Sequence, residues 1–375
     1  MDPANPYLLL TPGPLSTTST VKAAMLRDWS TWDVDYNEVV QRVRGELTAL
    51  AAGDGVAVAD ATAVLMQGSG TFVVEAAITS AVPEGGELLV VQNGAYGARI
   101  AKIAERARIQ CKSVDFGELG AVDVARVVAL LDRHPEITHV AMVHCETTTG
   151  MLNPAEEIGR ACRERGMSFV LDAMSSFGGV PMTLGSTGAD FLISSANKCI
   201  QGVPGFGFVV ARSAAMAACE GVARSLSLDL FDQWRGMEDG GGKWRFTSPT
   251  HVVLAFDQAL RELREEGGVA ARHARYVQNQ RTLVTGMRAL GIRPLLPDAW
   301  QSPVITGFHD PVDSGYAWRP FYDALKARGF AIYPGKVTDV PSFRVGTIGD
   351  VHPGDVERLL AAIADVFRET GWQVG

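Results

Sequence analysis

The sequence predicts a doubly wound, mostly parallel α/β sheet in a large domain, followed by a smaller α+β domain. Short apolar runs alternate with helical patterns of about ten residues, which is the rhythm of such a sheet. Most of these runs are continuously apolar, as expected for strands that are buried on both faces. The 375 residues exceed one ordinary core, so we expect an N-terminal arm over 1–20, a large domain over 21–265 and a small domain over 266–375.

Composition narrows the possible partners. The net charge is −8, with no basic block for nucleic acid. No apolar run reaches the roughly 18 residues that span a bilayer, and the first residues do not resemble a secretion signal. The five cysteines include no CxxC pair, so neither a metal site nor a disulfide framework is indicated. We therefore expect a cytoplasmic protein with no membrane partner, no nucleic-acid partner and no metal.

The first part of the chain shows the alternation most clearly. Pro12-Gly13-Pro14 fixes an extended arm that can only lie across another surface. A glycine-rich turn at 67–71 leads into a helix. The other predicted helices cover 20–27, 36–51, 98–108, 121–132, 154–165 and 213–224. The predicted strands cover 63–66, 88–91, 114–116, 139–144 and 168–171, together with the apolar runs on either side of Lys198.

The remainder mixes helices and strands at hairpin-like spacing. A helix at 251–266 leads into the small domain. The predicted helices there cover 270–290, 318–328 and 353–370. The predicted strands lie near 292–295 and at 304–308, 330–333 and 342–346.

Polar, aromatic and glycine residues follow several of the predicted strands. In an open α/β sheet, ligands bind at the carboxyl ends of the strands. The residues found there are Ser69, Gly70, Thr71, Tyr96, 146–149, Asp172 and Lys198. Ser69-Gly70-Thr71 lies between a strand and a helix, where backbone N–H groups and the helix dipole favour an anion such as phosphate. Taken alone, this segment could equally be a simple tight turn.

Lys198 is the residue around which this edge is organised. A lone lysine at a strand end is usually exposed, but a lysine between buried strands has a lowered pKa and becomes a nucleophile that forms Schiff bases. Asp172 ends the preceding strand. A lysine, an aspartate that can pair with a pyridinium nitrogen, a phosphate turn and an aromatic ring are what pyridoxal 5′-phosphate requires.

Eight segments carry a resemblance to a known family. They span nearly the whole chain, and they are 10–14, 68–71, 93–97, 145–150, 172–179, 194–205, 244–250 and 343–346. With these segments the chain resembles the class-V aminotransferases, which are fold-type I pyridoxal-phosphate enzymes. It is most similar to members that transfer the amino group of 2-aminoethylphosphonate to pyruvate, giving phosphonoacetaldehyde and L-alanine.

The resemblance implies a role for each matching residue. Lys198 would form the Schiff base and move the proton, and Asp172 would bind the pyridinium nitrogen. The residues implied to contact other parts of the cofactor are Ser69, Gly70 and Thr71 at the phosphate, Thr147 at the ring oxygen and Tyr96 on the ring face.

Two further roles follow from the same resemblance. Thr247 would reach the phosphate of the partner subunit in a homodimer, and Arg344 would bind the substrate anion, because a planar guanidinium suits carboxylate and phosphonate alike. Arg27, Arg99 and Arg245 are further candidates for that anion.

Three other functions stay open from the sequence. The nearest is alanine–glyoxylate or serine–pyruvate aminotransfer, which uses the same cofactor with a different amine. A cysteine desulfurase or other lyase needs a mobile catalytic cysteine, and no cysteine here lies in an obvious glycine- or serine-rich loop. A non-catalytic binding protein on the same scaffold would not form a Schiff base at Lys198.

Overall fold

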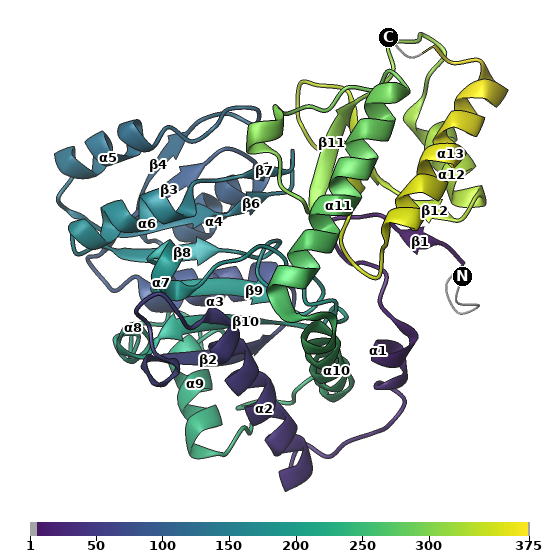
Figure 1. The fold of residues 1–375 in the computed structure, drawn as a ribbon. Helices are drawn as coiled ribbons and strands as arrows, with labels where there is room; N and C mark the ends of the chain where they lie inside the picture. The colour runs from purple at the N-terminus through teal and green to yellow at the C-terminus, as the bar shows by residue number, and fades with distance from the viewer. Residues whose placement is uncertain (1–5, 374–375) are drawn as a thin grey trace.

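A seven-stranded sheet dominates the computed structural model, which describes residues 6–373 (Figure 1). The strand order is β2-β10-β9-β8-β5-β3-β4. Only β10 runs antiparallel to its neighbours in this sheet, and helices cover both faces, so the predicted doubly wound, mostly parallel sheet is confirmed. The strands are β2 (Ala61–Gln67), β3 (Glu87–Gln92), β4 (Gln110–Asp115), β5 (Ile137–Val143), β8 (Ser168–Asp172), β9 (Phe191–Ser195) and β10 (Phe206–Arg212).

The helices of this region bury the apolar stripe that their sequence predicts. In α2, Val39, Val40, Val43 and Leu47 recur at helical spacing and all are buried. The helices are α1 (Ser19–Ala23), α2 (Val34–Ala51), α3 (Gly70–Ala81), α4 (Ala95–Arg106), α5 (Val124–Arg133), α6 (Ala155–Glu164), α7 (Leu184–Thr187), α8 (Ser213–Ala217), α9 (Leu230–Asp239) and α10 (Thr250–Glu266), with a short 3₁₀ turn η1 (Val58–Asp60).

A second, smaller sheet is antiparallel and has the order β11-β14-β13. It packs with helices around a separate apolar cluster that includes Phe308, Phe321 and Phe343. The elements are α11 (Gly268–Ala289), η2 (Asp298–Trp300), β11 (Ile305–His309), α12 (Trp318–Ala327), β12 (Phe330–Ala331), β13 (Tyr333–Pro334), β14 (Ser342–Gly346) and α13 (Pro353–Thr370). The helix α11 contributes Tyr276 to the first apolar cluster and Leu283 to the second, so the domain division at residue 265 stays a prediction.

The N-terminal arm crosses between the two sheets. Its strand β1 (Leu8–Leu9) pairs in parallel with β12, and the chain then passes the end of the large sheet before it reaches α1 beside α10 (Figure 1). Thr18 at the start of α1 donates to the carboxylate of Glu262 on α10. The arm therefore lies across another surface, as its proline content indicated.

Several predicted elements differ from the structure. The strand expected near 292–295 is reduced to one bridge between Pro294 and Phe308, which the hydrogen bonds Leu295 N–H to Gly307 O and His309 N–H to Arg293 O flank. The strand expected at 330–333 is split between β12 and β13, which belong to different sheets. The predicted helices at 20–27 and 213–224 are shorter, and α7, α9 and the hairpin β6 (Cys145–Glu146) and β7 (Met151–Leu152) were not predicted.

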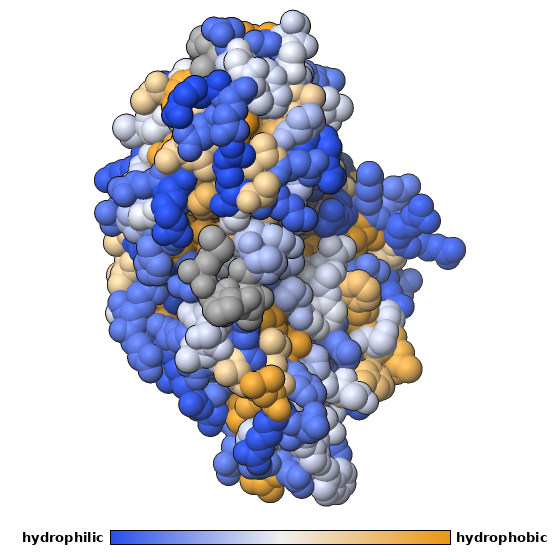
Figure 2. Space-filling model, turned by 90° about the vertical axis from the view of Figure 1, so that its right-hand side faces the viewer, coloured by the Kyte–Doolittle hydropathy of each residue, from blue (hydrophilic) through white to orange (hydrophobic). Residues whose placement is uncertain are grey.

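The surface is largely hydrophilic on the face shown in Figure 2. Apolar residues gather there in small, separate groups. Among residues 6–373, no helix combines the length and the apolar character needed to cross a bilayer.

Candidate active site

A cavity of about 330 Å³ opens at the carboxyl ends of the central strands. The structure brings six of the predicted site residues to its wall, and these are Ser69, Gly70, Thr71, Tyr96, Asp172 and Lys198. They meet because β2, β3, β8 and β9 run parallel to one another and end at the same edge of the sheet.

Lys198 projects into this cavity from the loop that follows β9. Its Nζ donates to the carbonyl oxygen of Pro12, at 2.8 Å, in the N-terminal arm. A Cβ on Gly13 would lie 2.9 Å from that nitrogen, so the arm can pass this closely only with glycine there. Burial lowers the pKa of Lys198, and the neighbouring Tyr96 and Asp172 offset this only in part. The neutral, nucleophilic form of the amine is thereby favoured.

Asp172 ends β8, the parallel neighbour of β9, and its carboxylate is buried. It accepts a hydrogen bond from the N–H of Met174 at 2.9 Å. Burial raises the pKa of Asp172 to about 6, the charge of Glu146 adds to the increase, and the Met174 hydrogen bond and the charges of Lys198 and Arg99 oppose it. A cationic group placed beside this carboxylate would restore its charge.

The turn before α3 has backbone donors suited to an anion. Ser69 is the N-cap of the helix, and its side chain makes no capping hydrogen bond. The first N–H groups of a helix have no intrahelical acceptor, and Gly70 and Thr71 present theirs at the cavity wall. Arg99 adds a positive charge, because its Nη1 donates to Thr71 Oγ1 at 2.9 Å.

Tyr96 lies in the first turn of α4, which begins at Ala95 and not near 98 as predicted. Burial alone would raise the pKa of Tyr96, but the charges of Lys336 and Lys198 and hydrogen bonds with Thr147 and Lys336 outweigh it, so the pKa is lowered. Thr147 is buried directly beside this hydroxyl, although it does not line the cavity wall.

Glu146 explains where α4 begins, and the sequence did not indicate this role. Its fully buried carboxylate accepts hydrogen bonds from the N–H groups of Tyr96 and Gly97, at 3.1 and 3.4 Å, which are orphan donors of the first helical turn. It also accepts from the N–H and Oγ1 of Thr148, at 3.1 and 2.6 Å. One carboxylate therefore fixes both the helix that carries Tyr96 and the segment that carries Thr147.

Arg344 comes to the site from β14 of the smaller sheet. Its side chain is buried, and it donates from Nη1 to the carbonyl oxygen of Thr147 at 2.7 Å and from Nε to that of Pro334 at 3.0 Å. Burial lowers its pKa, but a guanidinium stays protonated in proteins. Among residues 6–373 it has no ion-pair partner within 4 Å, so the charge is available to an anion.

Five predicted or candidate residues do not line this cavity. Thr147 and Arg344 lie behind its wall, next to Tyr96, and the other three lie elsewhere. Thr247 is exposed in the irregular segment before α10. Arg27 is exposed and its guanidinium lies 4.2 Å from the Trp29 ring centroid. Arg245 donates to the carbonyl oxygens of Asp229 and Leu226 and pairs with Asp232. Of the three arginine candidates, only Arg99 reaches the wall.

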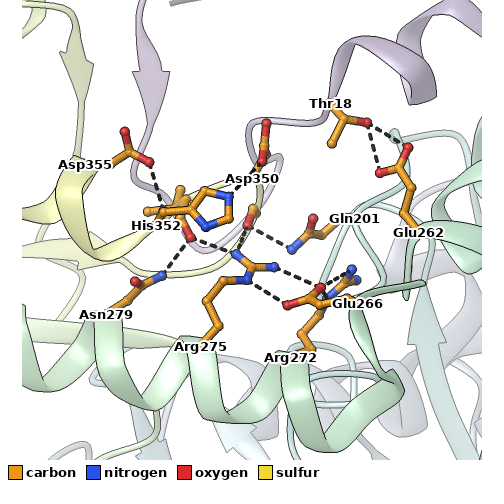
Figure 3. Close-up of polar contacts among 12 residues, drawn as sticks. Thr18, Gln201, Glu262, Glu266, Arg272, Arg275, Asn279, Asp350, His352 and Asp355 are labelled. Carbon is orange, nitrogen blue, oxygen red and sulfur yellow. Dashed lines mark hydrogen bonds and ion pairs between the residues drawn. The ribbon is translucent and has the colours of Figure 1, made fainter. Parts of the chain in front are cut away.

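A partly buried polar network around Arg272, Arg275 and Glu266 fixes the Lys198 loop to the rest of the molecule (Figure 3). Arg272 on α11 donates to the carbonyl oxygens of Cys199 and Ile200, directly after Lys198. Arg275, one turn later, donates to the carbonyl oxygens of Gly349 and Val351, which follow β14. Both arginines pair with Glu266. One ion network therefore connects the loop that carries Lys198 with the loop that follows β14, the strand of Arg344.

Comparison with known proteins shows the family of the chain. A family model described as "Aminotransferase class-V" matches residues 24–347. The 2-aminoethylphosphonate–pyruvate transaminase of Syntrophobacter fumaroxidans is 60% identical over 370 residues, which are 98% of both chains. The protein of the same name from Aeromonas hydrophila is 61% identical over 96% of this chain and 94% of its own.

Solved structures share the fold. The pyridoxamine–pyruvate aminotransferase of Mesorhizobium loti matches with a TM-score of 0.89 and 23% identity, covering all of this chain and 95% of its own.

The chain therefore belongs to the class-V aminotransferase family. Members of this family have the fold-type I architecture and use pyridoxal 5′-phosphate. Within the described range 6–373, no group of three or more histidine, cysteine or acidic side chains is arranged to hold a metal ion.

Proposed function

We propose that this protein transfers the amino group of 2-aminoethylphosphonate to pyruvate, giving phosphonoacetaldehyde and L-alanine. The observation that carries the chemistry is the pair Lys198 and Asp172 at the ends of adjacent strands in one cavity. The substrate is supported by relatives that are 60% and 61% identical over nearly the whole chain and bear that name.

The residues present fit pyridoxal 5′-phosphate. The N–H groups of Gly70 and Thr71, with Arg99 behind them, would hold a phosphate. The buried, proton-binding carboxylate of Asp172 would pair with the protonated ring nitrogen. Thr147 would bond the ring oxygen, and Tyr96 would cover the ring face. When bound, the cofactor supplies a carbonyl for the amine and a ring that withdraws electrons from the carbon bearing the nitrogen.

The protein's own groups account for the proton movements. Lys198 Nζ, whose pKa burial lowers, takes a proton from the substrate carbon that bears the nitrogen and returns a proton later in the cycle. Arg344 holds the anionic end of the substrate and so orients that carbon towards the lysine. The arm at Pro12 and Gly13 covers Lys198 and limits access of water.

We further propose a homodimer in which Thr247 reaches the phosphate site of the partner. Phe246, next to Thr247, is 52% exposed and borders a surface hollow. Gly68 and Phe72, which is 54% exposed, line the same hollow and flank the phosphate turn at 69–71. Exposed apolar side chains so close to a cofactor turn favour a partner surface.

Free thiols at all five cysteines are typical of the reducing cytoplasm, where we place the enzyme.

The test compares amines with pyruvate as the common acceptor. Purified enzyme loaded with cofactor should form alanine from 2-aminoethylphosphonate with a much higher kcat/KM than from serine. Alanine formation and aldehyde formation are measured together. Serine used as well as 2-aminoethylphosphonate would instead indicate serine–pyruvate aminotransfer, and release of sulfide from cysteine would indicate a desulfurase.

A further inference from the structure

A further cation lies beside Tyr96, in addition to Arg99, whose guanidinium carbon is 4.9 Å from the centroid of that ring. It is Lys336, which belongs to the hairpin that carries Arg344. The strands β13 and β14 pair Tyr333 with Arg344, and the connecting loop 335–341 begins with a hydrogen bond from Gly335 N–H to the Ser342 carbonyl oxygen. This loop places Lys336 Nζ 3.9 Å from the centroid of the Tyr96 ring. Two positive charges from one hairpin thus lie near Tyr96, a residue of the cavity wall.

Lys336 is not neutralised by the protein. Within residues 6–373 it forms no ion pair with any carboxylate, as is also the case for Arg344. Its electrostatic neighbour is Tyr96, whose ring lines the cavity together with Lys198. A partly buried ammonium group beside an active-site wall, with no carboxylate partner, is suited to bind an anion from solution.

The loop that carries Lys336 is also tied to the large domain by hydrogen bonds of its own. Thr338 donates from its N–H to Glu118 Oε2 at 2.7 Å and from Oγ1 to Oε1 at 3.3 Å. Glu118 lies in the turn after β4, at the carboxyl edge of the large sheet. This contact restrains the loop, so the position of Lys336 does not depend on its own side-chain contacts alone.

The chemistry of the two amino donors separates the roles of the two cations. In alanine, a singly charged carboxylate is bonded to the carbon that bears the nitrogen. In 2-aminoethylphosphonate, one more carbon intervenes, and the phosphonate is larger and carries up to two negative charges. An arginine that binds either anion therefore leaves part of the phosphonate charge unpaired. This unpaired charge lies farther from Lys198 Nζ than the carboxylate of alanine does.

We propose that Lys336 binds the phosphonate of the substrate and gives the site its preference for this dianion over a carboxylate. The inference rests on the proposed function, because it assigns a ligand within the same site. Arg344 serves both half-reactions, whereas Lys336 serves chiefly the one that begins with the phosphonate.

The two half-reactions provide the test. Pre-steady-state rates are measured for enzyme with 2-aminoethylphosphonate and separately with alanine, in wild type, Lys336→Ala, Lys336→Arg and the control Lys102→Ala, an exposed lysine on α4. For Lys336→Ala, the apparent affinity for 2-aminoethylphosphonate should fall about ten- to a hundredfold, as expected for one lost charge-assisted contact, while that for alanine stays within error. Lys336→Arg should retain most of the wild-type affinity for 2-aminoethylphosphonate, and Lys102→Ala should match wild type with both amines.

Other outcomes overturn the inference. Equal losses with both amines in Lys336→Ala would mean that the lysine only supports the Tyr96 ring. An unchanged affinity for 2-aminoethylphosphonate would mean that it is not a ligand. If wild type converts alanine but not 2-aminoethylphosphonate, the proposed function itself fails, and that result is recognised before any variant is compared. Thermal unfolding of each variant checks that the fold is retained.

Discussion

At the scale of single residues, Lys198 and Asp172 show how burial prepares two opposite charges for chemistry. The same loss of water lowers the pKa of the lysine and raises that of the aspartate to about 6. Burial thus disfavours the charged form of both residues. A bound cation at Asp172 and a carbonyl at Lys198 would each relieve this cost, so cofactor binding and folding stability are linked.

Asp172 carries a prediction for the protein without cofactor. For an acid whose pKa is higher in the folded state, stability is greatest below the unfolded pKa of 3.8 and is lost as pH rises through about 6. The shift corresponds to about 3 kcal/mol. Asp172→Asn should therefore have a higher free energy of unfolding than wild type at about pH 8, with the difference vanishing below about pH 4.

Urea denaturation across this pH range checks the prediction. Asp60→Asn is a matched control, because Asp60 is exposed in η1 and its substitution should produce no such trend. An Asp172→Asn variant that is no more stable than wild type at the higher pH would show that the burial of Asp172 is not costly.

At the scale of elements, the start of α4 depends on a residue from another segment. A helical pattern alone placed this start near residue 98, but the carboxylate of Glu146 accepts from Tyr96 and Gly97 and extends the helix to Ala95. A Cβ on Gly94 would lie 2.5 Å from the Cγ and Cδ atoms of Glu146, so the glycine is needed for this close approach.

Removing this anchor should weaken both the fold and the site. Glu146→Ala leaves buried N–H groups without an acceptor and should lower the free energy of unfolding by about 1–3 kcal/mol. Because Tyr96 loses its support, cofactor affinity should fall as well. Urea denaturation and cofactor titration measure the two effects, with Glu105→Ala on the exposed face of α4 as the control. Wild-type stability in Glu146→Ala would contradict the anchoring role.

The elements that the sequence predicts well are those with a long apolar period. The strand 342–346 and the helix 353–370 agree with β14 and α13 residue for residue. In contrast, α9 was missed because its buried face includes Gln233, whose amide donates to the Leu65 carbonyl oxygen and interrupts the apolar period. The strands β6 and β7 have two residues each, too few for any pattern.

The same distinction applies to the candidate site. Lys198, Asp172 and Ser69–Thr71 were predictable because each lies at the carboxyl end of a strand in one mostly parallel sheet. Glu146 was noticed only as part of a polar segment, since its partners on α4 are far away in sequence. Lys336 gave no local signal at all, because its place beside Tyr96 depends on how two sheets are packed together.

At the scale of the whole molecule, the proposed dimer would complete the cofactor site. We predict that the enzyme sediments as a dimer at assay concentrations. Thr247→Ala should leave the dimer intact and weaken cofactor binding by about tenfold through one lost hydrogen bond to phosphate. Phe246→Asp should produce monomers with a much larger loss, because the charge falls on the exposed apolar surface.

Sedimentation velocity and cofactor titration on the same samples test this arrangement. A wild-type protein that is monomeric and fully active, or a Thr247→Ala variant with unchanged cofactor affinity, would contradict it. Thr250→Ala at the start of α10 serves as a nearby threonine control.

The central claim is that Lys198 enables the transfer of an amino group from 2-aminoethylphosphonate to pyruvate. The most direct measurement is a half-reaction, in which cofactor-loaded enzyme is mixed with 2-aminoethylphosphonate alone and then with pyruvate. Wild type should release a stoichiometric amount of phosphonoacetaldehyde before pyruvate is added, and a stoichiometric amount of L-alanine afterwards. Lys198→Ala should slow both steps by at least about a hundredfold. Product formation only when both substrates are present, or undiminished rates in Lys198→Ala, would contradict the account.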